Sequence, residues 1–180
     1  MTTPESVIKF WFEEISRECH FKKDSDFDQL VETRFGLTLL QARVGELWHW
    51  RETARGALAE IIVLDQFSRN IYRDTADAFS ADSLALVLAQ EAVRRGLDQQ
   101  LPVTMRSFLY MPYMHSESAI VHEEALRLFD QPGLENSLKF EQRHKAIIDL
   151  FGRYPHRNRL LNRESTAQEI EFLKQPGSSF

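Results

Sequence analysis

The hydrophobic residues of this chain recur at intervals of three and four positions along most of its length. This is the spacing of one face of an α-helix, whereas a strand would show alternation. We predict about eight helices and no strand pair. The helices are expected to begin near residue 4 and then to cover roughly 25–48, 52–72, 81–95, 102–112, 121–129, 134–151 and 165–173.

Residues that start or stop helices support these limits. Thr3 can cap the first helix with Pro4 at its first position, and Ser165 with Gln168 has the spacing of a capping box. Gly96 stands where a glycine commonly ends a helix, and Pro112 should kink or stop the fifth one. The second helix should be weakened or bent by its internal glycine.

The predicted fold class is all-α. Helix pairs joined by short loops indicate a helical-repeat stack. At 180 residues the chain is long enough for one sizeable core and too short for two ordinary domains. We therefore expect a single helical domain over 1–180, with a tail that is loosely ordered from about residue 175.

Composition excludes several classes of partner. The net charge of -5 gives no basic field, so we expect no nucleic-acid or anionic-membrane partner. Cys19 is the one cysteine, which fits a reducing cytosol. The start lacks the features of a signal peptide, and no apolar run approaches the roughly 18 residues of a membrane span. The expected location is cytoplasmic, and the sequence does not indicate the oligomeric state.

Sequence motifs for cofactors are absent. The chain has no Gly-rich phosphate loop, no Gly-x-Ser-x-Gly elbow and no Cys-x-x-Cys pair. His115 and His122 are seven residues apart with acids nearby, but this spacing matches no recognised set of metal ligands. We expect no cofactor and no metal.

The third predicted helix is apolar on almost all sides and yet contains a dense polar stretch. Asp65, Arg69 and Tyr72 continue one of its apolar stripes, and Gln66 and Asn70 lie on a flank. Asp65 and Arg69 have the favourable acid-first spacing for a helical ion pair. Two interpretations stand side by side. The stretch is either a buried network that locks helices together or the wall of a pocket for a polar or anionic ligand.

Polar residues in other segments could join this stretch. His115 shares a helical face with apolar residues and has Glu117 nearby, and His144 lies within a core stripe. A core-facing histidine is more often a packing residue than a catalyst. Arg157 and Asn158 repeat the Arg69-Asn70 dipeptide in a turn before a helix start. There they could hold an anion or simply cap helix carbonyls.

The combined motifs resemble the bacterial domain-of-unknown-function family 924, over nearly the whole chain. The residues that carry the resemblance are Phe10-Trp11-Phe12, Gly45-Glu46-Leu47-Trp48, Leu64-Asp65-Gln66-Phe67-Ser68-Arg69-Asn70, Phe79-x-x-Asp82, Pro112-x-x-His115-Ser116-Glu117, His144, the run from Phe151 to Asn158, and Arg163-x-Ser165-Thr166. The resemblance implies a tetratricopeptide-like right-handed stack of antiparallel helix pairs. It implies no reaction, because the family has no established activity.

These observations favour a helical binding protein with one internal polar cleft. The ligand would be a small anionic or polar molecule or a peptide terminus. The candidate lining residues are Asp65, Gln66, Arg69, Asn70, His115, Glu117, His144, Arg157 and Asn158.

Two alternatives remain open at this stage. One is a hydrolase or transferase in which His115 or His144 acts as a general base, assisted by Glu117 or Asp65, with an arginine stabilising negative charge. The other is a scaffold that binds a partner protein through an exposed apolar groove.

Overall fold

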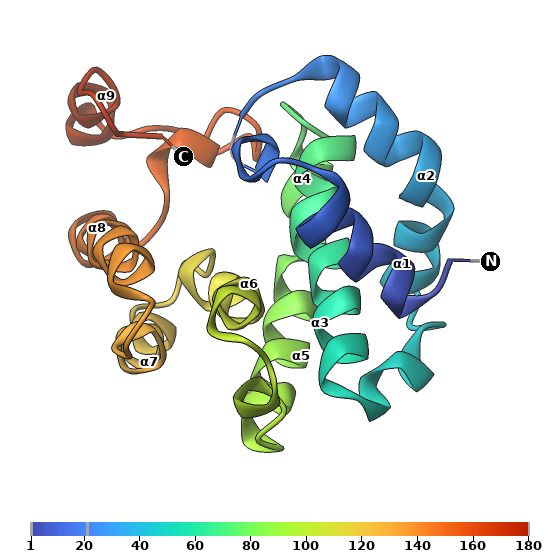
Figure 1. Ribbon diagram of the computed structural model, residues 1–180. Helices are drawn as coiled ribbons and strands as arrows, with labels where there is room; N and C mark the ends of the chain where they lie inside the picture. The colour runs from blue at the N-terminus through green and yellow to red at the C-terminus, as the bar shows by residue number, and fades with distance from the viewer. Residues whose placement is uncertain (1, 21, 180) are drawn as a thin grey trace.

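A computed structural model describes residues 2–20 and 22–179, and within them every regular element is helical. Figure 1 shows the arrangement of the helices. The α-helices are α1 (Pro4–Lys9), α2 (Ser25–Arg43), α3 (Ala54–Ile62), α4 (Ser68–Ile71), α5 (Asp82–Arg94), α6 (Val103–Met114), α7 (Ala119–Phe129), α8 (Glu135–Phe151) and α9 (Ala167–Leu173). The all-α prediction is confirmed.

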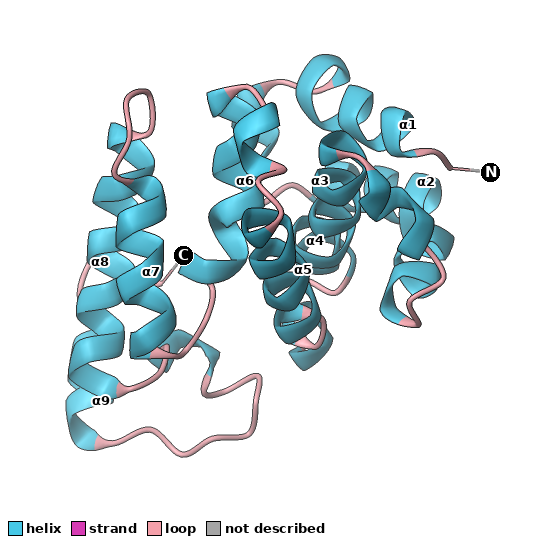
Figure 2. Cartoon of the chain, turned by 90° about the horizontal axis from the view of Figure 1, so that it is seen from below, coloured by secondary structure: helices cyan, strands magenta, loops and turns pink. Residues whose placement is uncertain are grey.

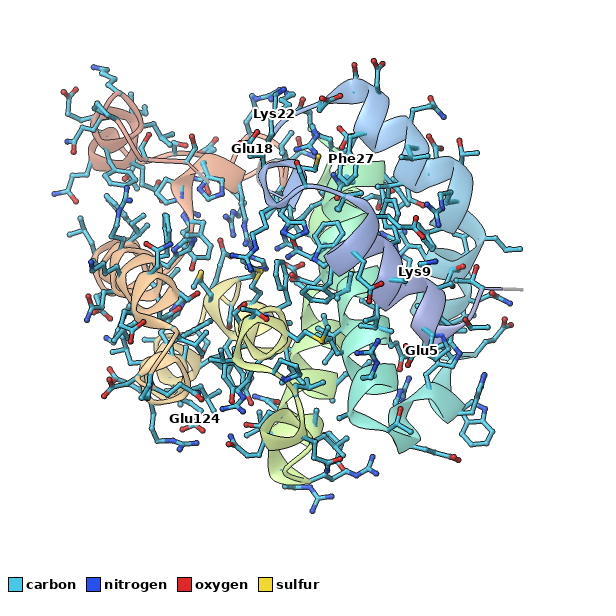
Figure 3. All side chains as sticks on the ribbon, in the orientation of Figure 1. Glu5, Lys9, Glu18, Lys22, Phe27 and Glu124 are labelled. Carbon is cyan, nitrogen blue, oxygen red and sulfur yellow. The ribbon has the colours of Figure 1, made fainter. Side chains whose placement is uncertain are left out.

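The helix α3 lies at the centre of the larger part of the core. It contacts α1, α5 and α6, while α2 packs across α4 and the turn that precedes it. All of the residues from Gly56 to Ile62 are buried, which explains the lack of a polar face on this helix. The side chains fill the spaces between these helices (Figure 3).

The helices α7 and α8 form an antiparallel pair that packs on α6. Figure 2 shows the pair at one side of the molecule, with α6 between it and the helices of the amino-terminal half. After α8 the chain turns at Gly152, which is left-handed with φ 69°. The segment 152–166 then leads to α9 without a long helix of its own. The polar contacts of this segment build much of the site described below.

Several predicted helix ends are confirmed and others are wrong. Thr3 caps α1, and Gly96 follows α5 in the left-handed region. The cap of α9 is Thr166 rather than Ser165, because the Thr166 hydroxyl accepts from Glu169 N while Glu169 caps in return. The helix α6 continues past Pro112 to Met114 instead of ending at the proline.

The second predicted helix is shorter than expected, and it passes through its glycine. It ends at Arg43 rather than near residue 48, and Gly45 follows with φ 79°. Gly36 lies inside α2, where the helix continues on both sides of it.

A π-helical turn interrupts the central helix. Residues Val63–Phe67 form this turn, between α3 and α4. The sequence predicted an uninterrupted α-helix here. Such wide turns are frequent at functional sites, and this one contains Asp65 and Gln66. None of the helices in the described ranges is both long and apolar enough to cross a membrane.

Candidate functional site

Arg69 joins the central helix to the start of α5. Its guanidinium donates to both carboxylate oxygens of Asp82, at 2.8 and 2.9 Å, in the bidentate geometry that favours this pair. The same group donates to the Asp65 main-chain oxygen at 2.8 Å and to the Asp65 carboxylate at 3.2 Å. Asp82 is the first residue of α5, where a carboxylate is stabilised by the helix dipole. Arg69 therefore bridges two acids from different helices.

Asp65 also holds His115, the residue that follows α6. Asp65 Oδ1 and His115 Nδ1 are 2.7 Å apart, and Gln66 Nε2 donates to the other carboxylate oxygen at 2.5 Å. Burial alone would raise the pKa of the Asp65 carboxyl, but its charge interactions with His115 and Arg69 hold that pKa below the ordinary value. Burial and the Arg69 charge lower the pKa of His115. At neutral pH an ionised Asp65 thus accepts the Nδ1 proton of a neutral imidazole.

The tautomer fixed by Asp65 leaves the other ring nitrogen of His115 with a lone pair. His115 Nε2 makes no hydrogen bond with the described residues, and it is not one of the buried side-chain atoms that lack a partner there. The imidazole side chain is 16% exposed. This arrangement is the one that a general base requires, with a carboxylate on one nitrogen and access to the other.

Arg157 comes from the turn after α8 and lies between two aromatic rings. Its guanidinium carbon is 4.6 Å from the centre of the Phe79 ring and 4.7 Å from that of Tyr154. It donates to the His115 main-chain oxygen at 3.0 Å and reaches Asp82 at 3.4 Å, a long contact. Its Nε is buried without a hydrogen-bond partner in the described residues. Burial and the neighbouring Arg69 lower the pKa of Arg157.

Together, Asp65, Arg69, Asp82, His115 and Arg157 form what we call the arginine cluster. Its members come from the π turn, α4, the start of α5, the end of α6 and the turn after α8. The Arg69 side chain is 21% exposed and that of Asp82 is 17% exposed, so one edge of the cluster meets solvent. Two surface grooves lie elsewhere, one between α5 and α7 and one beside α2.

Glu117 and Asn158 lie beside this cluster and hold a different arginine. Glu117 accepts both terminal nitrogens of Arg163, at 2.6 and 2.9 Å, and it also accepts Tyr154 N at 2.7 Å. Asn158 accepts from Arg163 Nε at 3.0 Å and donates to Ser165. Burial would raise the pKa of Glu117, but the hydrogen bonds from Arg163 and Tyr154 lower it. These bonds fasten the segment after α8 to the loop before α7.

His144 and Asn70 are placed away from the arginine cluster's hydrogen bonds. His144 packs edge-on against the Tyr154 ring at 5.7 Å and donates from Nδ1 to the Phe140 main-chain oxygen. Burial lowers the pKa of His144 to about 3. Asn70 donates to Asp28 of α2, which Arg73 also binds through two nitrogens. The flank with Asn70 therefore anchors α2, as a structural network would.

A second histidine–carboxylate pair, between α7 and α8, is absent from the sequence prediction. His122 Nδ1 is 2.6 Å from Glu141, and His122 Nε2 donates to the Ser116 main-chain oxygen at 2.8 Å. The Tyr154 hydroxyl donates to the Met114 oxygen at 2.5 Å and also lies 3.2 Å from His122 Nε2. Tyr154 thus contacts both this pair and Arg157 of the arginine cluster.

The sequence prediction also missed Asp82, Phe79 and Tyr154 as site residues. Asp82 was visible as an acid at a predicted helix start, and its place beside Phe79 in one motif was the available signal. Nothing in the local pattern of Tyr154 indicates that it stacks on an arginine from its own turn. Among residues 2–20 and 22–179, no group of three or more His, Cys, Asp or Glu side chains is placed to hold a metal ion.

Comparison with known families and structures places the chain. Residues 7–177 match the family described as "Bacterial protein of unknown function (DUF924)". The chain belongs to this family. The chain is similar to a solved structure, that of the protein of unknown function ATU0120 from Agrobacterium tumefaciens. The two sequences are 36% identical, and the structures superpose with a TM-score of 0.91. The match covers 95% of this chain and 96% of that one. Among curated proteins no match is found.

Proposed function

We propose that the arginine cluster of this DUF924 protein binds a small anionic ligand, a carboxylate or a phosphate. The observation that carries the proposal is the unused donor capacity of Arg157. A guanidinium has five N–H groups, and Arg157 uses one for His115 O and one for a long contact to Asp82. Arg69 likewise makes no hydrogen bond through Nε to the described residues. At the exposed edge, a ligand anion would accept from Arg69 Nε and from the N–H groups of the terminal Arg157 nitrogens that the described residues leave unpaired.

Charge and shape support an anion over a cation. Asp65 and Asp82 already balance the two arginines, and both carboxylates accept bonds from within the cluster. The groups left with free capacity are therefore donors. Planar guanidinium groups bind carboxylates and phosphates through paired hydrogen bonds. The Phe79 ring, which lies under both guanidinium groups, restricts their orientation.

Thermal-shift measurement against inorganic phosphate and a panel of small carboxylates tests this proposal. A ligand that binds only the folded chain stabilises it by about 2.7 kcal/mol at a hundred times its dissociation constant. Arg157→Met should abolish the shift. Arg73→Met is the matched control, since Arg73 pairs with Asp28 of α2, away from the arginine cluster, and it should keep the shift. A panel without any shift, or one unchanged by Arg157→Met, would refute the proposal.

The geometry of Asp65 and His115 favours a second candidate function, that of a hydrolase. With Asp65 on Nδ1, His115 Nε2 could take a proton from water while an arginine stabilises the negative charge that develops on the substrate. The test is the hydrolysis of p-nitrophenyl acetate and p-nitrophenyl phosphate by the wild-type chain and by His115→Gln. Turnover that depends on His115 supports catalysis, and equal rates in both proteins refute it.

A further inference from the structure

The outer face of α2 exposes a row of large apolar side chains. The row, which we call the α2 seam, consists of Leu30, Leu37 and Leu40 on the helix, Val44 at its C-cap and Trp48 just beyond it. Leu37 is 73% exposed and Val44 is 72% exposed. In Figure 1 α2 lies at the margin of the molecule, with its opposite face toward the core. Single exposed apolar residues are ordinary, but several that recur along one face of a helix indicate a contact surface.

The spacing along the seam is that of a helix-packing surface. Leu30, Leu37 and Val44 are seven residues apart, and Leu40 falls between the last two at the intermediate position of a heptad. The residues of α2 that face the core, among them Phe27, Val31 and Phe35, occupy other heptad positions. The α2 helix thus has two apolar faces, one buried in the fold and one exposed on the surface. A heptad seam fits the matching seam of another helix.

Charge around the seam suits a second copy of the same surface. No carboxylate occurs between positions 33 and 45, although the whole chain has a net charge of -5. The two arginines of that stretch are already engaged inside the chain. Arg34 pairs with Glu14 at 2.7 Å, and Arg43 donates to the Asp77 main-chain oxygen and lies over the Tyr72 ring. Over positions 33–45, two identical seams can therefore meet without bringing like carboxylates together.

Gly36 supplies an independent observation beside the seam. A glycine inside a helix destabilises it by roughly 1 kcal/mol relative to alanine. Nothing in residues 2–20 and 22–179 requires it here, since a Cβ atom at this position would meet only the Glu32 side chain, at 3.8 Å. The absent side chain leaves room for another backbone to approach α2 closely. The same position lies next to Leu37 and Leu40, the centre of the seam.

We propose that the α2 seam is a dimer interface, in which α2 packs antiparallel against α2 of a second copy of this chain. A two-fold contact of this kind covers both seams at once and closes the assembly. Antiparallel packing also sets Arg34 of one copy beside Gln41 of the other, which keeps the arginines apart. Two heptads form a small contact beside the roughly 800 Å² per partner of a standard interface, so we expect a micromolar dissociation constant.

Sedimentation velocity from about 1 to about 200 µM tests the interface, since this range spans a micromolar equilibrium. The wild-type chain should change from monomer to dimer across the range. The double variant Leu37→Glu, Leu40→Glu should stay monomeric at every concentration, and its melting temperature at low concentration should match the wild type because both positions are exposed. Leu150→Glu, at an exposed position of α8, is the control and should still dimerise.

Gly36→Leu separates the interface from simple fold stability. The added side chain should weaken the dimer by at least about tenfold, while the loss of a mid-helix glycine should raise the melting temperature of the monomer. These two changes have opposite signs, so a general folding defect could not produce both. A wild-type chain that is monomeric throughout the range would overturn the proposal. So would a dimer that survives the double glutamate substitution, since the contact would then lie elsewhere.

Discussion

Two histidine–carboxylate pairs of nearly equal length occur in the fold, one in the arginine cluster and one between α7 and α8. Asp65 and His115 are 2.7 Å apart, and Glu141 and His122 are 2.6 Å apart. The second pair is completely enclosed, with both side chains 0% exposed, and both ring nitrogens of His122 are hydrogen-bonded. The first pair is reached by solvent, and His115 uses one nitrogen only. Unused bonding capacity, rather than the pair itself, distinguishes a candidate site from a structural contact.

The charges around the two pairs also differ. Asp65 has Arg69 in contact, and the pKa of Asp65 is lowered despite its burial. Glu141 has no arginine among its hydrogen-bond partners, and its Oε2 is buried without a hydrogen bond in the described residues. Burial raises the pKa of Glu141. Because a buried ionised oxygen without a partner is costly, Glu141 is the acid of the two that is expected to keep its proton.

The largest expected effect comes from opening the enclosed pair. Glu141→Ala removes the partner of His122 Nδ1 and leaves both a cavity and an unpaired buried nitrogen. We expect the free energy of unfolding to fall by about 2–4 kcal/mol, the combined cost of a cavity and an unsatisfied buried nitrogen. Urea unfolding at pH 7, with the midpoint and the slope both fitted, measures the change.

Glu141→Gln is the matched control for this experiment. If Glu141 is protonated and donates to His122 Nδ1, the glutamine amide can donate in its place, so the loss should be only about 1 kcal/mol. Equal losses for the alanine and glutamine variants would show that Glu141 acts as a carboxylate. A loss below 1 kcal/mol for alanine would remove the structural role assigned to this pair.

A second, smaller effect is expected from acid. Burial lowers the pKa of His144 to about 3 and that of His156 to about 4, both below the ordinary histidine value of 6.5. The unfolded chain then binds more protons than the folded one between these pKa values and 6.5. The contribution of these histidines to the free energy of unfolding should therefore be complete above pH 6.5. It should decrease as the pH falls toward 4, by about 1.4 kcal/mol per pH unit for each histidine.

His144→Asn sharpens this prediction. The variant removes one titrating group, so the acid-side slope of the unfolding free energy should become shallower by about one proton, whatever its stability at pH 7. Urea unfolding at several pH values between 4 and 7 gives both slopes. Parallel curves for the variant and the wild type would mean that His144 is not kept neutral by its burial.

The sequence predicted the helices well because their signals are local. Thr3, Pro4 and Gly96 act through the backbone of their own turn, and the structure confirms each of them. The cap of α9 was misplaced by one residue since Ser165 and Thr166 offer the same hydroxyl. Pro112 was expected to kink or stop its helix, and α6 does not stop there but runs two residues further. The π turn at Val63–Phe67 has no signature in the hydrophobic spacing.

The candidate site was predictable only in part. Asp65 and Arg69 stood out because they are charged residues in an apolar helix. Their contacts with His115 and Arg157 could not be predicted, because those residues come from segments far apart in the chain. The sequence could not separate Arg69 from Asn70, although the first turns toward α5 and the second toward Asp28 of α2. It also could not distinguish the two histidine environments. That distinction depends on which ring nitrogen finds a partner after packing.

The smallest expected effect on stability, and the most direct test of the comparison, comes from His115. His115→Gln keeps an N–H donor for Asp65, and the position is partly exposed, so we expect a change of at most about 1 kcal/mol in the free energy of unfolding.

In the wild type, diethylpyrocarbonate, which acylates neutral and accessible imidazole nitrogens, should modify His115. His122 should react more than about tenfold more slowly, because it must first be exposed by local opening. Peptide mass spectrometry over time measures both rates. Similar rates for the two histidines would contradict the assignment of one pair as open and the other as enclosed, since Nε2 of His122 is bound to Ser116 and that of His115 is not.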